Sequence, residues 1–124
     1  MSSENKLTVP ASKSIGQLKA RKASNILTQI SEGIKQIYED RVKKIILYGS
    51  QARGDARPDS DFDILIVLNS SFNYSEESQR ISKFIADICL ENSIVISCTF
   101  ASEDKYQNHE SAFFSNVRRE GIFI

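Results

Sequence analysis

The segment KKIILYGSQARGDARPDSDFDILIVL, residues 43–68, contains two short apolar runs joined by a polar stretch rich in Gly, Pro and Ser. The runs at 45–48 and 64–68 have the length and β-branched content of buried strands, and the polar stretch is typical of a loop. We therefore expect two strands whose connecting loop carries an active site, with the rest of the chain organised around that pair.

Two aspartates enter the second run. Side chains on a strand alternate between its two faces, so Asp61 and Asp63 would project from one face while Phe62 points into the opposite layer. Two carboxylates held this close repel each other, and a shared proton or a divalent cation relieves that repulsion. Mg²⁺ fits best, because it takes oxygen ligands and keeps room for substrate phosphates.

The turn after the first run has the residues that an anion site needs. Gly49 lacks a Cβ, which permits a tight turn and the close approach of a bulky anion. Ser50 adds a hydroxyl beside backbone N–H donors, and a helix starting just after it would add partial positive charge. The turn and the two aspartates together predict a binding site for an Mg²⁺-bound triphosphate. For either motif alone, a surface hairpin with Asp61 as a turn residue is the simpler interpretation.

The combined motif resembles a known family. Gly49-Ser50, ten intervening residues and then Asp61-Phe62-Asp63 are similar to the signature of the polymerase β-type nucleotidyltransferases. The Gly-Ser-x-x-Arg-Gly form and the small size of the chain most resemble the minimal nucleotidyltransferase (MNT) group, which is encoded beside HEPN-domain partners. The resemblance covers residues 47–67 and implies an α/β (α+β) fold, in which a small mixed β-sheet packs against helices.

The resemblance implies roles for five residues. Asp61 and Asp63 would hold Mg²⁺ and act as catalytic carboxylates, and ATP would be the substrate. Gly49, Ser50 and Arg53 would bind the nucleotide together with the aspartates, and Ser50 would also take part in catalysis.

The basic side chains near the loop have alternative partners. A guanidinium can bind phosphate or carboxylate through two hydrogen bonds, so an ion pair of Arg53 with Asp55 or Asp59 is as well supported as a nucleotide contact. Lys44 and Arg57 are further candidates for contacts with phosphate.

The chain departs from the family pattern in one place. Members of the family supply a third carboxylate from a later strand, but the corresponding strand here, 94–100, has Ser97 and no acid. Glu91, Glu103 and Asp104 are the nearest possible replacements. Either the enzyme works at a reduced rate, with water or the partner as base, or it acts by binding alone. The intact pair of aspartates favours the first interpretation.

The remaining segments complete the predicted fold. A helix over 14–38 capped by Ser14 and a helix over 75–90 are indicated by apolar residues at helical spacing. Helices at 103–109 and 111–120 follow the strand at 94–100, and residues 122–124 form an edge strand or a docking segment.

Length and charge limit the classes of function. With 124 residues, we expect a flexible arm over 1–12 and a single minimal nucleotidyltransferase domain over 13–124. The 16 basic and 16 acidic residues cancel, which argues against the chain as a whole binding nucleic acid through its charge. No apolar run has the length of a membrane span and no signal peptide is recognisable, so we expect a cytoplasmic protein that does not contact a membrane.

The predicted reaction is attack of an acceptor oxygen on the α-phosphorus of a nucleoside triphosphate, with release of pyrophosphate. Resemblance to the MNT antitoxins implies transfer of AMP from ATP to a tyrosine hydroxyl of a cognate HEPN ribonuclease toxin, which neutralises it in a complex of the two proteins. One alternative is a catalytically weak or silent antitoxin that acts by direct binding. Another is a nucleotidyltransferase for a small hydroxylated molecule, although such enzymes usually carry an added domain.

Overall fold

The computed structural model describes residues 17–57 and 60–124. The elements are α1 (Gln17–Tyr38), the 3-10 helix η2 (Glu39–Arg41), β1 (Val42–Tyr48), α2 (Ser50–Arg53), β2 (Phe62–Leu68), α3 (Tyr74–Asn92), β3 (Ile96–Ser102), α4 (Glu103–Asn108), α5 (Ala112–Glu120) and β4 (Ile122–Phe123). These elements confirm the predicted helices and strands apart from small shifts at their ends, while the predicted cap Ser14 and the arm over 1–12 lie outside the described residues. None of the helices in the two described ranges has the length and apolar content of a transmembrane span.

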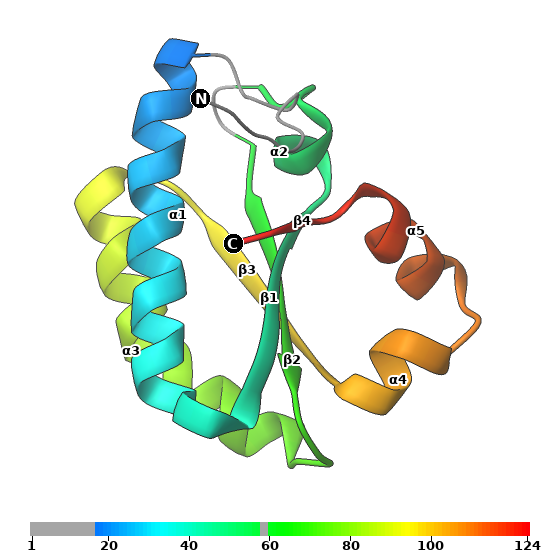
Figure 1. Cartoon of the computed structure of the whole chain (residues 1–124). Helices are drawn as coiled ribbons and strands as arrows, with labels where there is room; N and C mark the ends of the chain where they lie inside the picture. The colour runs from blue at the N-terminus through cyan, green and yellow to red at the C-terminus, as the bar shows by residue number, and fades with distance from the viewer. Residues whose placement is uncertain (1–16, 58–59) are drawn as a thin grey trace, which may run out of the picture.

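The four strands form one mixed sheet in the order β3-β2-β1-β4 (Figure 1). β1 is antiparallel to both β2 and β4, whereas β2 is parallel to β3 and connects to it through α3. Parallel neighbours need such a crossover because the chain must return to the starting end of the sheet. The predicted fold class is confirmed, and of the predicted terminal segment 122–124, Ile122–Phe123 form an edge strand.

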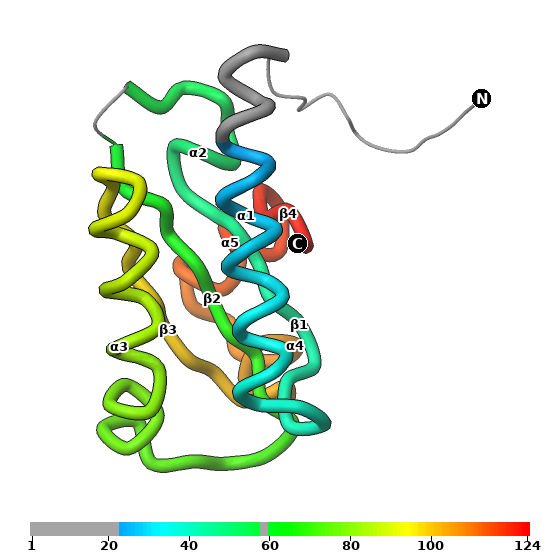
Figure 2. The backbone as a smooth tube through the Cα atoms, turned by 90° about the vertical axis from the view of Figure 1, so that its left-hand side faces the viewer, coloured from blue at the N-terminus to red at the C-terminus, as the bar shows by residue number. Residues whose placement is uncertain are grey.

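Helices cover both faces of the sheet. α1 and α3 lie side by side on one face, with α4 and α5 on the other (Figures 1 and 2). Because side chains alternate along β2, Ile64 and Ile66 are buried with α1 and α3, whereas Leu65 and Val67 are buried with α4 and α5. Phe62 belongs to the α1–α3 side, as predicted.

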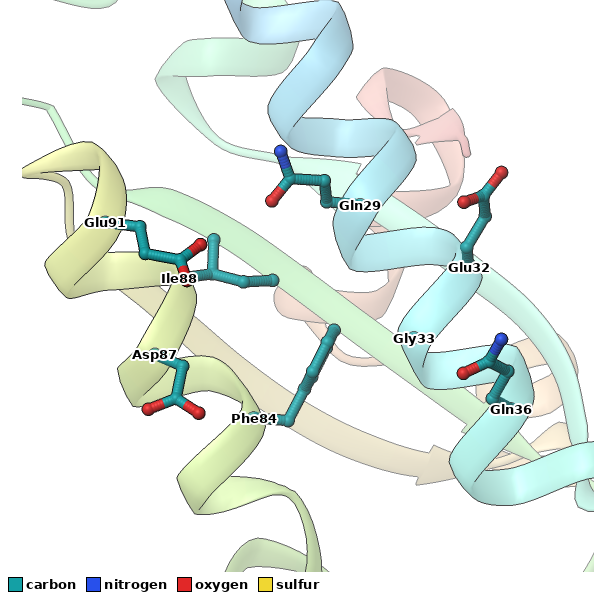
Figure 3. A pocket seen from close by; sticks show the side chains of 8 residues that line it. All are labelled: Gln29, Glu32, Gly33, Gln36, Phe84, Asp87, Ile88 and Glu91. Atoms are coloured by element: carbon teal, nitrogen blue, oxygen red, sulfur yellow. The ribbon is translucent and has the colours of Figure 1, made fainter.

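α1 and α3 meet closely at a glycine. The ring of Phe84 on α3 points toward Gly33 of α1 and takes up the space that a Cβ there would need (Figure 3). Beside this contact lies a groove of about 360 Å³, whose rim carries Glu32, Asp87 and Glu91. This groove lies between α1 and α3, on the opposite side of the sheet from Leu65.

A buried carboxylate joins α3 to the end of α1. Glu77 is only 3% exposed, and its two oxygens accept hydrogen bonds from Arg41 at 2.6 Å and Arg80 at 3.0 Å. The Tyr38 hydroxyl donates to the Glu77 backbone carbonyl at 3.2 Å. Burial would raise the pKa of Glu77, but the hydrogen bonds and charges of the two arginines outweigh burial and lower the pKa below its ordinary value.

This ion cluster predicts a loss of stability in acid. A carboxyl whose folded-state pKa is lowered stabilises the fold above its unfolded pKa, near 4.5, and that contribution disappears as the pH falls through the folded pKa. Glu77→Gln should therefore lower the free energy of unfolding by about 2 kcal/mol at pH 7, with a smaller difference from wild type at pH 3. Denaturant unfolding at both pH values measures this.

Asp87→Asn is the matched control on the same helix. Asp87 pairs with Lys83 at 3.0 Å, but both side chains are largely exposed. Such a surface pair contributes less than about 1 kcal/mol, so this variant should stay close to wild type at both pH values. Equal effects of the two substitutions would contradict a special role for the Glu77 cluster.

Candidate active site

The pairing of β1 with β2 brings the Gly-Ser turn to the aspartates. Tyr48, the last residue of β1, lies opposite Asp63 in the antiparallel register. The next residue, Gly49, is the N-cap of α2, which begins at Ser50. The side-chain amide of Gln51 donates to the Ser60 carbonyl at 3.2 Å, which ties α2 to the segment just before β2. The turn and the start of β2 therefore lie together at one end of the sheet.

Gly49 is required at this position for two reasons. Its backbone has φ 77° and ψ −156°, a conformation essentially restricted to glycine. A Cβ on Gly49 would also collide with Oδ2 of Asp63, so the carboxylate lies directly against the bare backbone of the turn. The structure thus brings together Gly49 and Asp63, which the sequence predicted to share one site.

The two aspartates influence each other. Asp63 is half-buried and Asp61 is exposed. Burial raises the pKa of Asp63, the negative charge of Asp61 raises it further, and the nearby Arg53 lowers it. Desolvation and repulsion of this kind are what a bound cation relieves.

The donor set fits Mg²⁺ in part. Asp61 and Asp63 provide two carboxylates at the start of one strand, with Asp63 on the sheet face of Leu65. Within 17–57 and 60–124, no group of three or more His, Cys, Asp or Glu side chains could hold a metal. Mg²⁺ commonly binds through one or two carboxylates, with water and substrate phosphates in its other positions. The site thus suits a metal that arrives with a phosphate ligand.

Ser97 lies beside Asp63, on the strand from which the family pattern would supply a third acid. The two residues are direct partners in the parallel pairing of β2 with β3, and Ser97 is exposed. The proposed replacements are wrong in position: Glu103 and Asp104 begin α4 at the far end of β3, and Glu91 lines the α1–α3 groove. The topology explains the first two, because β3 runs away from the site and α4 begins where β3 ends. Glu91 instead lies on the α1–α3 face, across the sheet from Asp63.

Lys44, one of the two candidates for a further phosphate contact, lies away from the site. Lys44 pairs with Val67, near the opposite end of β1 from Gly49. Its ammonium lies 3.8 Å from the carboxylate of Glu103. The strand begins at Val42 rather than at residue 45, so Lys44 is a strand residue and not a neighbour of the loop.

Arg53 connects α2 to two acids. Its Nε lies 3.3 Å from Oδ2 of Asp55, and its Nη1 lies 3.4 Å from Oε1 of Glu120 on α5. The Asp55 alternative is therefore observed, while Asp59 lies outside the described residues. Arg57 is exposed, and its backbone N–H donates to the Ser60 hydroxyl at 2.8 Å.

An aromatic wall beside Asp63 could not be read from the sequence. The Tyr48 hydroxyl and the Thr99 hydroxyl lie 3.3 Å apart, so the Tyr48 side chain crosses over β2. Phe113 of α5 packs edge-on against the Tyr48 ring, with the ring centres 5.4 Å apart, and remains 38% exposed. Burial raises the pKa of Tyr48, and the charge of Asp63 adds to this. Only the position of Tyr48 directly before Gly49 indicates in the sequence that its ring lies near the site.

Comparisons with known proteins agree with this geometry. The family described as "Nucleotidyltransferase domain" matches residues 27–111. A "Putative protein adenylyltransferase" of Methanocaldococcus jannaschii is 35% identical over 100 residues, which cover 77% of this chain and 90% of that protein. A second protein of the same description and organism is 35% identical over 72 residues, covering 58% of this chain and 72% of its own length.

The fold also has a counterpart among crystal structures. A "putative nucleotidyltransferase" from Sulfolobus solfataricus superimposes with a TM-score of 0.58 and 18% identity, covering 87% of this chain and 86% of that one. At this identity the match supports the fold alone.

Two glycine substitutions test whether the fit to Asp63 matters. Gly49→Ala should displace the Asp63 carboxylate and weaken binding of Mg²⁺ with a fluorescent ATP analogue by at least about tenfold, or about 1.4 kcal/mol. Gly54→Ala is the matched control, because Gly54 also has positive φ, 84°, but a Cβ there meets nothing within 4 Å. Comparable loss of binding in both variants would show that backbone strain alone is responsible.

Proposed function

Because the chain belongs to the nucleotidyltransferase domain family, we propose that it transfers AMP from ATP to a hydroxyl group of another protein. The observation that carries the proposal is the contact between the Gly49 backbone and the Asp63 carboxylate. This contact supports a site in which the Gly-Ser turn would bind the phosphates and the two aspartates would hold the metal of a metal-bound triphosphate. The M. jannaschii relatives, whose names describe protein adenylyltransferases, support a protein acceptor.

Asp61 and Asp63 would hold Mg²⁺, which supplies charge neutralisation for the triphosphate and for the pyrophosphate that leaves. On the protein side, the N–H groups of Ala52 and Arg53 donate to the Gly49 carbonyl, so the donors at the start of α2 that can face a phosphate are the N–H groups of Ser50 and Gln51. With the Ser50 hydroxyl they would donate hydrogen bonds to the oxygens of the β- and γ-phosphates. α2 has only four residues, so these local donors matter more than any helix dipole.

In the reaction, an acceptor oxygen bonds to the α-phosphorus, and the bond between that phosphorus and the β-bridging oxygen breaks. The acceptor proton leaves to water or to a base on the partner, since Ser97 occupies the place beside Asp63 where an acid could take it. The protein mainly holds the acceptor oxygen, phosphorus and leaving oxygen in line. Arg53 would exchange its pairs with Asp55 and Glu120 for phosphate oxygens.

A phenol is the acceptor that this site suits best. A tyrosine hydroxyl has a pKa near 10 and ionises far more readily than an aliphatic alcohol, so it needs less help from a protein base. Together with the resemblance to the MNT group, this supports a tyrosine of a cognate HEPN ribonuclease toxin as acceptor. AMP transfer would then neutralise the toxin.

One observation favours a second candidate function. The described part of the chain shows no third acid beside the pair of carboxylates, which is also compatible with an antitoxin of little or no activity that blocks its partner by contact. In that case the nucleotide site would be a remnant.

The intact mass of the partner distinguishes the two functions. After incubation of the HEPN protein with wild-type chain, ATP and Mg²⁺, we expect a mass increase of one or more AMP units. Asp63→Asn should reduce the transfer rate by at least about 10³-fold, through loss of charge stabilisation at the reacting phosphate. Asp104→Asn, at the far end of β3, should leave the rate unchanged. Neutralisation of the toxin by Asp63→Asn without any mass increase would instead support the contact-only antitoxin.

A further inference from the structure

β4 covers only part of the outer edge of β1. Its residues pair with Ile46 and Leu47, and the Ile124 N–H donates to the Ile45 carbonyl at 2.9 Å. β1 continues beyond this point to Val42. Among the strands of the described residues, none lies beside this remaining part of the edge. Three residues of β1, 42–44, therefore lie beyond the reach of β4.

The uncovered edge lies along a groove of about 630 Å³, which we call the β1 edge groove. It is formed by the end of α1, η2, the first half of β1 and the C-terminal residues, through Lys35, Glu39, Val42, Lys43, Lys44, Ile45, Phe123 and Ile124. Its apolar residues come from β1 and from the C-terminal strand. Phe123 is 65% exposed, which is high for a large apolar side chain at the end of a sheet.

The backbone of β1 is irregular at this place. The register with β2 shifts between Val42 and Lys44, so Lys43 is an extra residue without a direct partner on β2. Such bulges and edge lysines keep ordinary strands from pairing with an exposed edge. A strand that pairs here must therefore gain enough from other contacts to offset both the bulge and the repulsion by the lysines.

The charges of the groove indicate which kind of strand could pair with this edge. Lys35, Lys43 and Lys44 line it, but the ammonium of Lys44 is already paired with Glu103. Glu39 is the one acidic side chain among the lining residues, so Lys35 and Lys43 supply the positive charge that a partner can meet. A second copy of the chain is disfavoured, because a symmetric pairing of two β1 edges would bring the same lysines face to face. A strand with acidic side chains meets attraction where other strands meet repulsion.

We propose that the β1 edge groove binds an extended acidic segment of a partner polypeptide, which adds to the sheet in line with β4. Successive side chains of an extended segment point to opposite faces of the sheet. Apolar residues would therefore pack beside Phe123, which lies on the α4–α5 face with its partner Ile46, while acidic residues reach Lys35 and Lys43. The groove lies toward the opposite end of β1 from Gly49. A segment bound there leaves the acidic pair free, and the proposal does not depend on the proposed reaction.

The probe is a fluorescein-labelled six-residue peptide in which Glu and Val alternate, titrated with the full chain and followed by fluorescence anisotropy. We expect saturable binding that weakens as salt is raised. The double variant Lys35→Glu/Lys43→Glu should bind this peptide roughly tenfold or more weakly, since it reverses two charges of the groove. Lys105→Glu on α4 is the control for charge alone and should keep wild-type affinity, with thermal melting to verify that each variant is folded.

Two further measurements locate the site and the chemistry. Amide resonances of residues 42–45 and 122–124 should shift on addition of the Glu-Val peptide, and a Lys-Val peptide should produce no shift. Equal binding by the double variant and by Lys105→Glu, shifts confined to other residues, or no binding up to millimolar peptide would each overturn the proposal. So would a concentration-dependent dimer that buries the same edge.

Discussion

The contact between the bare backbone of Gly49 and the carboxylate of Asp63 is the constraint on which the rest of the site depends. It exists because Tyr48 and Asp63 are partners in the antiparallel pairing of β1 with β2. A shift of one residue in the pairing of β1 with β2 would turn Asp63 toward α1 and α3 and Phe62 toward the opposite face. Burial of Phe62, Ile64 and their neighbours against α1 and α3 prevents that shift, so the core fixes the position of the acid.

The two faces of the sheet have different tasks. On one face, α1 and α3 bury most of the apolar side chains and are joined through Glu77, which gives the sheet a rigid support. On the other face, α4 and α5 cover Leu65 and Val67. The side chains nearest the start of β2 and β3 are left partly open, and Ser97 is exposed there. Asp63 and Ser97 are therefore accessible at one end of a sheet whose other side chains are largely buried.

Much of the fold could be predicted from local sequence patterns. Helical spacing of apolar residues identified α1 and α3, β-branched runs identified β1 and β2, and alternation placed Phe62 opposite to its neighbouring aspartates. These features depend on residues close together in the chain. The closeness of the Gly-Ser turn to Asp63 also followed, because two adjacent antiparallel strands bring the end of one to the start of the next.

Features that depend on the direction of strands or on the docking of distant helices could not be predicted. Lys44 was a candidate for a phosphate contact because it precedes the motif, and Glu103 for the third acid because it follows the third strand, yet the two residues meet at the other end of the sheet. The pair of Arg53 with Glu120 requires α5 to lie beside α2. The same docking creates the aromatic wall of Tyr48 and Phe113. No periodicity in the sequence encodes such contacts.

The most direct test of the account is calorimetric titration of the full chain with ATP, in Mg²⁺ and in excess chelator. If Gly49, Ser50, Asp61 and Asp63 form one site for a metal-bound nucleotide, one ATP binds per chain in Mg²⁺ and the heat is lost in chelator. Asp61→Asn should abolish the dependence on metal. ATP binding that is equal with and without Mg²⁺, or no detectable heat in Mg²⁺, would contradict the account.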